Sequence, residues 1–207
     1  MTSRAPGKRV RKAPAERRTE IVTTAARIGL TEGLECITLR RIADELGVQP
    51  GLVGHYFRAV DDLVAEAFSH ATMTELDGLL PPRTGAPLDT FRRFFGLISS
   101  TEFDDVSQLW LNARHLSRYR PVLREHVVSQ ELLWCRRLEE VIAAGAAAEV
   151  FRCADPWGAA CRVLVAIDGA SAYINTSAEM RRAPIAGMPR AVAEAELGLE
   201  RGALTAD

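Results

Sequence analysis

Apolar residues recur every three or four positions along most of the chain, which is the spacing of amphipathic helices. The first such segment runs from about Pro14 to Gly33, with Ile21, Val22, Ala25, Ala26 and Ile28 on its apolar face. Further helical segments run over about 61–71, 88–99, 106–119, 121–148, 155–176 and 188–204. The chain lacks the alternation of apolar and polar residues that is typical of β-strands. The pattern therefore predicts an all-α fold.

Two short helical patterns joined by a turn lie within residues 38–57, TLRRIADELGVQPGLVGHYF. Thr38 can cap the first helix, because its hydroxyl can accept a hydrogen bond from a free backbone N–H. Gly47 stands where a helix can end in a left-handed conformation, and Pro50 suits the first position of the second helix. This layout is that of a helix-turn-helix, whose second helix enters the major groove of DNA.

Over residues 14–68 the chain resembles the TetR family of bacterial transcriptional regulators. The resemblance rests on Ile21, Ala25, Gly33, the run from Thr38 to Ala43, Gly47-Val48, Pro50-Gly51, His55-Tyr56-Phe57 and Leu63. It implies a three-helix DNA-binding head over residues 14–60 and a helical effector-binding and dimerisation body over residues 61–207. We expect residues 1–13 to form a disordered basic arm.

Three positions depart from the pattern of the family. Gly54 stands where the family usually has tyrosine and Val60 where it has lysine, and both of those residues commonly contact the DNA backbone. The resemblance therefore implies weaker and less salt-dependent DNA binding. Gly54 also lowers helix propensity by roughly 1 kcal/mol relative to alanine. Gln49 replaces the serine that often caps the recognition helix.

Residues at the start of the recognition helix and beside it are the expected DNA contacts. They are Thr38, Arg40, Arg41, Gln49, Pro50, Gly51, Leu52, His55 and Tyr56. We expect Arg40 to reach a guanine or a phosphate, and Leu52 to pack on a thymine methyl. Two alternatives remain open: Arg41 as a solvent-facing charge, and Tyr56 as a residue that packs between helices.

The charge distribution is typical of a DNA-binding domain attached to an acidic body. The net charge is −1, but residues 1–60 hold 11 Lys/Arg and 6 Asp/Glu, whereas residues 61–207 hold 15 and 21. A basic head is attracted to phosphates and an acidic body is repelled by them. The arm could track phosphates or enter a minor groove, or it could be a solvated tail.

Unusual residues on the body helices are candidates for an effector site. They are Phe103, Trp110, Arg114, His115, Tyr119 and Trp134, with Phe94 and Met73 as apolar wall. Tryptophan and tyrosine combine an apolar face with a donor, which suits a ligand pocket. The alternatives are core packing for the tryptophans, and solvated charge or capping for Arg114 and His115. Asp168 is interpreted as a paired interface acid or an exposed residue at the edge of its helix, with a ligand contact as a third alternative.

The segment over residues 155–176 is apolar on two faces, so it needs two partners. One face holds Trp157, Cys161, Leu164 and Val165, and the other holds Ala160, Val163, Ile167 and Ala170. We expect the second partner to be another copy of the chain, because a twofold dimer reads a palindromic operator. The stretch from Trp110 to Leu123, with Asp168-Gly169, is similar to the branch of the family that contains the choline/betaine-pathway repressor.

Several other classes are excluded. No apolar run approaches the ~20 residues of a membrane span, and no secretory signal follows the basic N-terminus. The four cysteines lack metal-ligand or paired spacing, so we expect reduced, mostly buried thiols in a cytoplasmic protein. HExxH, GxSxG, Walker A and dinucleotide-loop motifs are absent, so we expect no enzyme, cofactor or metal.

The expected function is that of a ligand-responsive dimeric regulator, in the first instance a repressor that a small molecule releases from DNA. An activator or an effector-independent regulator is an alternative. From a different class, a helical protein-binding adaptor is another.

Overall fold

The computed structural model describes residues 13–82, 85–181 and 184–205. These residues form nine α-helices and no strand, which confirms the predicted all-α fold. The α-helices are α1 (Pro14–Glu32), α2 (Leu39–Leu46), α3 (Pro50–Tyr56), α4 (Val60–Leu79), α5 (Pro87–Ile98), α6 (Asp104–Ser117), α7 (Pro121–Ala147), α8 (Pro156–Ile174) and α9 (Met188–Glu196). Short 3-10 helices, Leu34–Cys36, Thr101–Phe103 and Ala178–Arg181, precede α2, α6 and α9.

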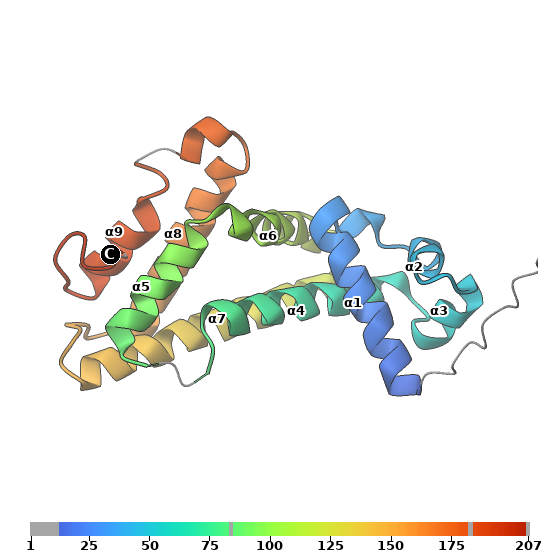
Figure 1. The fold of residues 1–207 in the computed structure, drawn as a ribbon, viewed down its shortest axis with the longest axis horizontal. Coiled ribbons are helices and arrows are strands. Elements are labelled where there is room, and N and C mark those ends of the chain that lie inside the picture. Colours follow the sequence, from blue (N-terminus) through green and yellow to red (C-terminus); the bar gives the residue numbers. More distant parts are fainter. Residues whose placement is uncertain (1–12, 83–84, 182–183, 206–207) are drawn as a thin grey trace, which may run out of the picture.

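Helices α1, α2 and α3 pack into a small head at one end of an elongated molecule (Figure 1). Ile21 of α1, Ile42 of α2 and Val53 of α3 are all fully buried in this head. Phe57, the residue that follows α3, completes the same core. Burial of one apolar residue from each helix holds the head together, because α2 and α3, with 8 and 7 residues, are too short to be stable alone.

Two long helices connect the head to the body. Helix α4 packs along α1 in the head and then runs beside α7 toward the far end, where α5, α8 and α9 lie (Figure 1). Helix α8 packs against both α7 and α9, and α6 lies between the head and the body. Phe91, Phe94 and Phe95 of α5 are buried in this core, with Phe94 close to Trp134 of α7.

Most helix ends lie where the sequence signals predicted them. The Asp155 carboxylate accepts a hydrogen bond from the Gly158 N–H at 3.0 Å and so caps α8. Asp61 and Asp62 occupy the first turn of α4, where carboxylates interact favourably with the helix dipole. Helix α4 extends to Leu79, well beyond the apolar pattern that suggested it.

The prediction for the last helix is wrong at its end. Helix α9 stops at Glu196 instead of near Leu204, because Gly198 and Gly202 adopt left-handed φ angles of 63° and 91°. The carboxylate of Glu194 accepts hydrogen bonds from the backbone N–H groups of Gly202 and Leu204, at 3.0 and 3.1 Å. These bonds fold the segment after α9 back onto the helix and bury Leu204.

The expectation of mostly buried thiols is also wrong. All four cysteines lie in the described ranges and carry free thiols, and one of them, Cys135, is buried. Cys36 is exposed, whereas Cys153 and Cys161 are half-buried. None of the helices in the described ranges is long and apolar enough to cross a membrane.

Candidate nucleic-acid interface and effector site

The recognition helix α3 presents its first turn to solvent. Val53 and Phe57 anchor the helix in the core of the head, whereas Leu52 remains 36% exposed. Four further predicted DNA contacts are also exposed: Gln49, Pro50, Gly51 and His55. The structure thus brings five of the predicted DNA contacts together on one open surface.

The turn between α2 and α3 has the geometry that the sequence predicted. The Thr38 hydroxyl accepts a hydrogen bond from the Arg41 N–H at 3.0 Å, which confirms the cap. Gly47 has φ 61° and ψ 39°, so it ends α2 in the left-handed conformation. The Thr38 hydroxyl accepts in this bond, so its own hydrogen is still available to donate to a phosphate.

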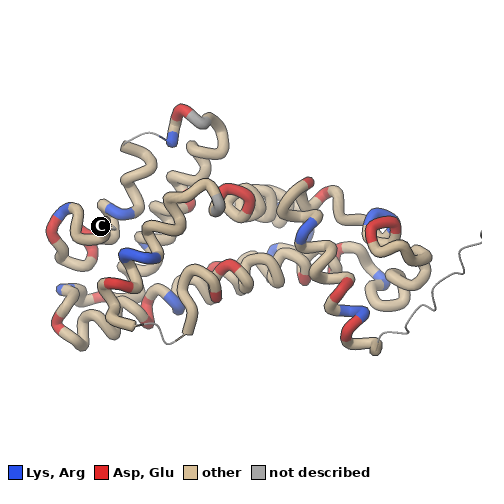
Figure 2. Tube along the Cα trace, in the orientation of Figure 1, with Lys and Arg blue, Asp and Glu red and all other residues tan. Residues whose placement is uncertain are grey.

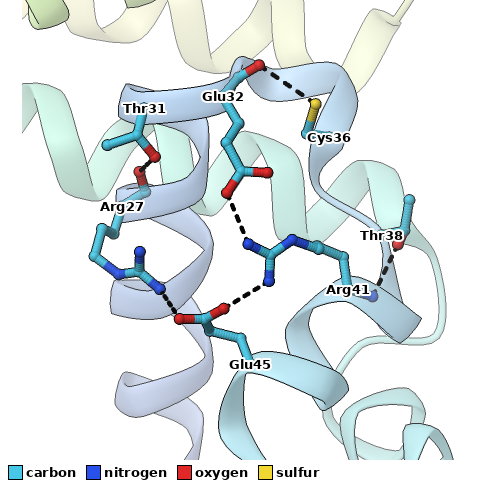
Figure 3. A network of polar contacts seen from close by, with 7 residues as sticks. All are labelled: Arg27, Thr31, Glu32, Cys36, Thr38, Arg41 and Glu45. Atoms are coloured by element: carbon cyan, nitrogen blue, oxygen red, sulfur yellow. Dashed lines mark hydrogen bonds and ion pairs between the residues drawn. The ribbon is translucent and has the colours of Figure 1, made fainter.

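Ion pairs connect α2 to α1 and involve one of the predicted DNA contacts (Figure 3). The guanidinium of Arg41 donates to Glu45 at 2.6 Å and to Glu32 at 2.7 Å, and Arg27 of α1 also pairs with Glu45. Hydrogen bonds from Arg41 lower the pKa of Glu45, and those to Glu45 and Glu32 raise the pKa of Arg41. This geometry favours a structural role for Arg41, in which it holds the helix-turn-helix on α1.

Arg40 has very different surroundings from its neighbour. Its side chain is 86% exposed, against 35% for Arg41. Within the part of the chain that the structure describes, its ion-pair partner is Asp44, at 3.9 Å. Such a pair is weak in water, so the Arg40 side chain can turn toward DNA at little cost.

Tyr56 packs on the core of the head and also contacts its exposed neighbour, His55. Its ring is half-buried and packs against the core of the head, which agrees with the alternative role in packing. It also meets the ring of His55 edge-on, with the ring centres 5.5 Å apart. His55 is exposed and is therefore the more accessible of these two predicted DNA contacts.

Apart from the arm, the head is electrically balanced. Residues 13–60 hold six Lys/Arg and six Asp/Glu, and the two kinds of charge intermingle along the head (Figure 2). The excess of positive charge comes from five Lys/Arg within residues 1–12. The predicted arm lies almost wholly outside the described residues. Attraction of the head to phosphates therefore depends on residues 1–12 and on exposed side chains such as Arg40.

The candidate effector residues separate into two groups. Phe103, Trp110, Arg114 and Trp134 line a small interior cavity of about 20 Å³, together with Phe94, Ile98, Glu131, Leu164, Ile167 and Asp168. A cavity of this size can hold about one water molecule. His115 and Tyr119 are exposed and pack edge-on against each other, with their ring centres 5.9 Å apart. Met73 is also exposed, so these three residues lie outside the cavity.

Arg114 organises the polar side of this cavity. Its guanidinium donates to Glu131 at 2.9 Å and to Asp168 at 2.6 Å, and its central carbon lies 5.0 Å from the centre of the Trp110 ring. Burial raises the pKa of Asp168, although Arg114 opposes the effect. Asp168 is therefore a paired acid within one subunit, and Arg114 links α6, α7 and α8.

A larger hollow lies beside this cavity. It is a groove of about 520 Å³ between α1, α4, α5 and α6, and Phe103 belongs to the walls of both hollows. Glu75 of α4 lines the groove and is not among the residues predicted from sequence. An available signal was its spacing: it lies four residues after buried Ala71 and four before buried Leu79, on the apolar face of its helix.

Neither hollow resembles a metal site. Among the residues that the structure describes, no group of His, Cys, Asp or Glu is arranged to hold a metal ion. The Trp134 indole N–H is buried and has no acceptor in the described part of the chain. The interior cavity therefore offers one unused donor to a water or ligand atom.

The arrangement of head and body is that of TetR-family transcriptional regulators, as comparison with solved structures shows. A TetR transcription regulator from Haloarcula marismortui is 22% identical, with a TM-score of 0.72 over 89% of this chain and 97% of that chain. A TetR-family transcriptional regulator from Cytophaga hutchinsonii is 17% identical, with a TM-score of 0.71 over 92% and 99%. A regulator structure from Saccharomonospora viridis, solved in complex with choline, is 22% identical, with a TM-score of 0.70 over 87% and 95%.

The chain therefore has the TetR fold, and the resemblance seen in its N-terminal motifs is confirmed at that level. No protein-family model matches the chain, and no curated protein does.

Proposed function

We propose that this protein is a transcriptional regulator that binds a palindromic operator as a homodimer and is released from DNA by a small molecule. We propose that it acts as a repressor, with activation as the alternative. A protein that acts on DNA in this way would work in the cytoplasm.

The observation that carries the proposal is the recognition helix. Its first turn is exposed at the end of the head, while Val53 and Phe57 hold the helix from behind. A helix held in this way can enter a major groove as a rigid body, which is how helix-turn-helix proteins read base edges. Gly51 adds to this, because a Cβ there would have open space around it and the backbone can approach the groove closely.

The dimer is supported by the second apolar face of α8. Ala160, Val163 and Ile167 are buried inside the body. On the outer side Val165 is 69% exposed, and Trp157 is exposed as well. Exposed apolar residues on a helix already packed on its other side are typical of a protein interface. A second copy of α8 and α9 is the partner that we propose for them.

Ligand release is supported by the two hollows. The groove lies where α1 of the head meets α4, α5 and α6 of the body, so a molecule bound there would contact helices of both parts. The interior cavity lies beside it, among α5, α6, α7 and α8. The choline in the Saccharomonospora viridis structure belongs to that protein. For this chain it supports the proposal that the body takes a small organic molecule.

The experiment that tests the proposal is footprinting of the purified protein on a few hundred base pairs upstream of its own gene, at two salt concentrations. We expect a protected palindrome. Arg40→Ala should weaken binding by roughly 1–3 kcal/mol if Arg40 reads a guanine, or reduce the salt slope by about 1 if it contacts a phosphate. Arg201→Ala is the matched control, because Arg201 is exposed and lies after α9, at the opposite end of the chain from the head.

The other functions make different predictions. Deleting the gene should raise transcription of the regulated neighbours if the protein is a repressor and lower it if the protein is an activator. An effector-independent regulator would protect the operator whatever metabolite is added. A protein-binding adaptor would give no footprint at either salt concentration, and that result would overturn the proposal.

A further inference from the structure

Glu75 of α4 lines the groove, and both of its carboxyl oxygens are buried. The described side chain close enough to donate a hydrogen bond to this carboxyl is that of Trp110. The residues that influence the pKa of Glu75, Trp110 and Asp168, line the interior cavity. A buried carboxyl that has no positively charged partner is costly to ionise.

Burial raises the pKa of Glu75 to about 8, helped by the negative charge of Asp168, although hydrogen bonding with the Trp110 side chain lowers it. In the free protein at neutral pH the carboxyl is therefore mostly protonated. A ligand that supplied a positive charge and N–H donors would stabilise the ionised carboxylate and displace this proton.

The positive side chains around Glu75 are already engaged. On the groove side, Arg27 of α1 pairs with Glu45, and Arg93 of α5 donates to the backbone carbonyls of Gly78 and Leu79. His70 of α4 lies within hydrogen-bond distance of Thr23, at 3.3 Å.

On the cavity side, Arg114 of α6 is shared between Glu131 of α7 and Asp168 of α8. When ionised, Glu75 and these two acids would together carry three negative charges against the one positive charge of Arg114. On the cavity side, the surroundings of Glu75 therefore favour a cation and repel an anion. On the groove side, Arg93 keeps its positive charge because its acceptors are neutral carbonyls, so the ammonium group must lie close to Glu75 and away from Arg93.

We propose that the groove between α1, α4, α5 and α6 binds a primary or secondary ammonium compound with an apolar body, whose N–H groups donate to Glu75. This inference deepens the proposed function, on which it rests for the effect of the ligand on DNA. A volume of about 520 Å³ suits a small organic molecule. Leu30, Leu97, Phe103 and Val106 supply the apolar contacts. A quaternary ammonium carries the charge but cannot donate a hydrogen bond to either oxygen of Glu75.

The test is calorimetric titration of the full chain with three matched probes: phenylpropylamine, its trimethylammonium analogue and phenylpropanol. We expect the amine to bind at least about tenfold more tightly than the other two at about pH 8.5. Its affinity should rise roughly 25-fold between about pH 6.5 and about pH 8.5, because the ionised fraction of a group with a pKa of about 8 rises from about 3% to about 75%. The amine itself remains charged over this range, as the lysine side chain does.

Glu75→Gln should abolish both the preference for the amine and its pH dependence while leaving binding of the alcohol unchanged. Glu140→Gln is the matched control, since Glu140 is exposed on α7 and outside the groove. The fold of each variant is checked by thermal unfolding. The probe series and the pH series on the unaltered protein test the proposal independently of any variant.

Equal binding of amine and alcohol, or unchanged amine binding by Glu75→Gln, would overturn the inference. Footprinting keeps this result separate from the proposed function. A footprint with no amine binding would overturn the inference alone. Amine binding that leaves the footprint unchanged would support the ligand class and contradict ligand release.

Discussion

Replacing Gly54 by alanine should stabilise the protein, although the position lies inside the recognition helix. Glycine costs about 1 kcal/mol relative to alanine within a helix, and α3 is short, so each residue matters. A Cβ added at Gly54 would meet Leu39 Cδ1 at 4.0 Å, which is ordinary van der Waals contact. We therefore expect the free energy of unfolding to rise by about 0.4–1 kcal/mol, and the melting temperature by about 1–4 °C.

The assay is urea unfolding followed by far-ultraviolet circular dichroism, with two other glycines as controls of opposite sign. Gly47→Ala should destabilise the protein by about 1–2 kcal/mol, because Gly47 has a left-handed φ of 61°. Gly145→Ala should destabilise it more strongly, since the added Cβ would lie 2.0 Å from Phe151 Cδ2. If Gly54→Ala were neutral or destabilising while the controls behaved as expected, the result would refute the helical backbone of α3 at Gly54 and the free space beside it.

Three further results are expected. Arg41→Ala should lower the melting temperature, because it removes the ion pairs that join α2 to α1; a loss of operator affinity with unchanged stability would instead assign Arg41 to DNA. Deleting residues 1–12, which carry five Lys/Arg, should flatten the salt dependence of operator binding. In fluorescence anisotropy, the slope of the logarithm of the DNA-binding constant against the logarithm of salt concentration should fall by up to about 4–5. An unchanged slope would show that the arm is a solvated tail. In timed alkylation followed by mass spectrometry at about pH 8, exposed Cys36 should react quickly and Cys135 slowly. Burial raises the pKa of the Cys135 thiol to about 12, and the reactive thiolate forms only as the pH approaches that value. Rapid modification of Cys135 would contradict its burial.

The candidate DNA surface was predictable to a large extent from sequence, because its signals are local. The cap at Thr38 and the left-handed Gly47 each depend on a few neighbouring residues. The same holds for Pro50 at the start of α3. What sequence could not distinguish was Arg40 from its neighbour Arg41. One is exposed and the other paired because Glu32, on a different helix, lies beside only the second.

The candidate effector site was much less predictable from sequence than the DNA surface. Phe103, Trp110, Arg114 and Trp134 were identified by residue type, but periodicity did not show that they share one cavity. The partners of Arg114 lie 17 and 54 residues away along the chain. Such contacts are set by the packing of α6 on α7 and α8.

By itself, the sequence determined that this protein is all-α, where most of its helices begin, and that its N-terminal head carries a helix-turn-helix. Periodicity, caps and glycine conformations act within one or two turns and can be recognised directly. The tertiary structure decided which charges are neutralised, that α9 ends at Glu196, and that the carboxyl of Glu75 is buried. The physical reason is that burial and ion pairing depend on residues distant in the chain that come together only when the helices pack.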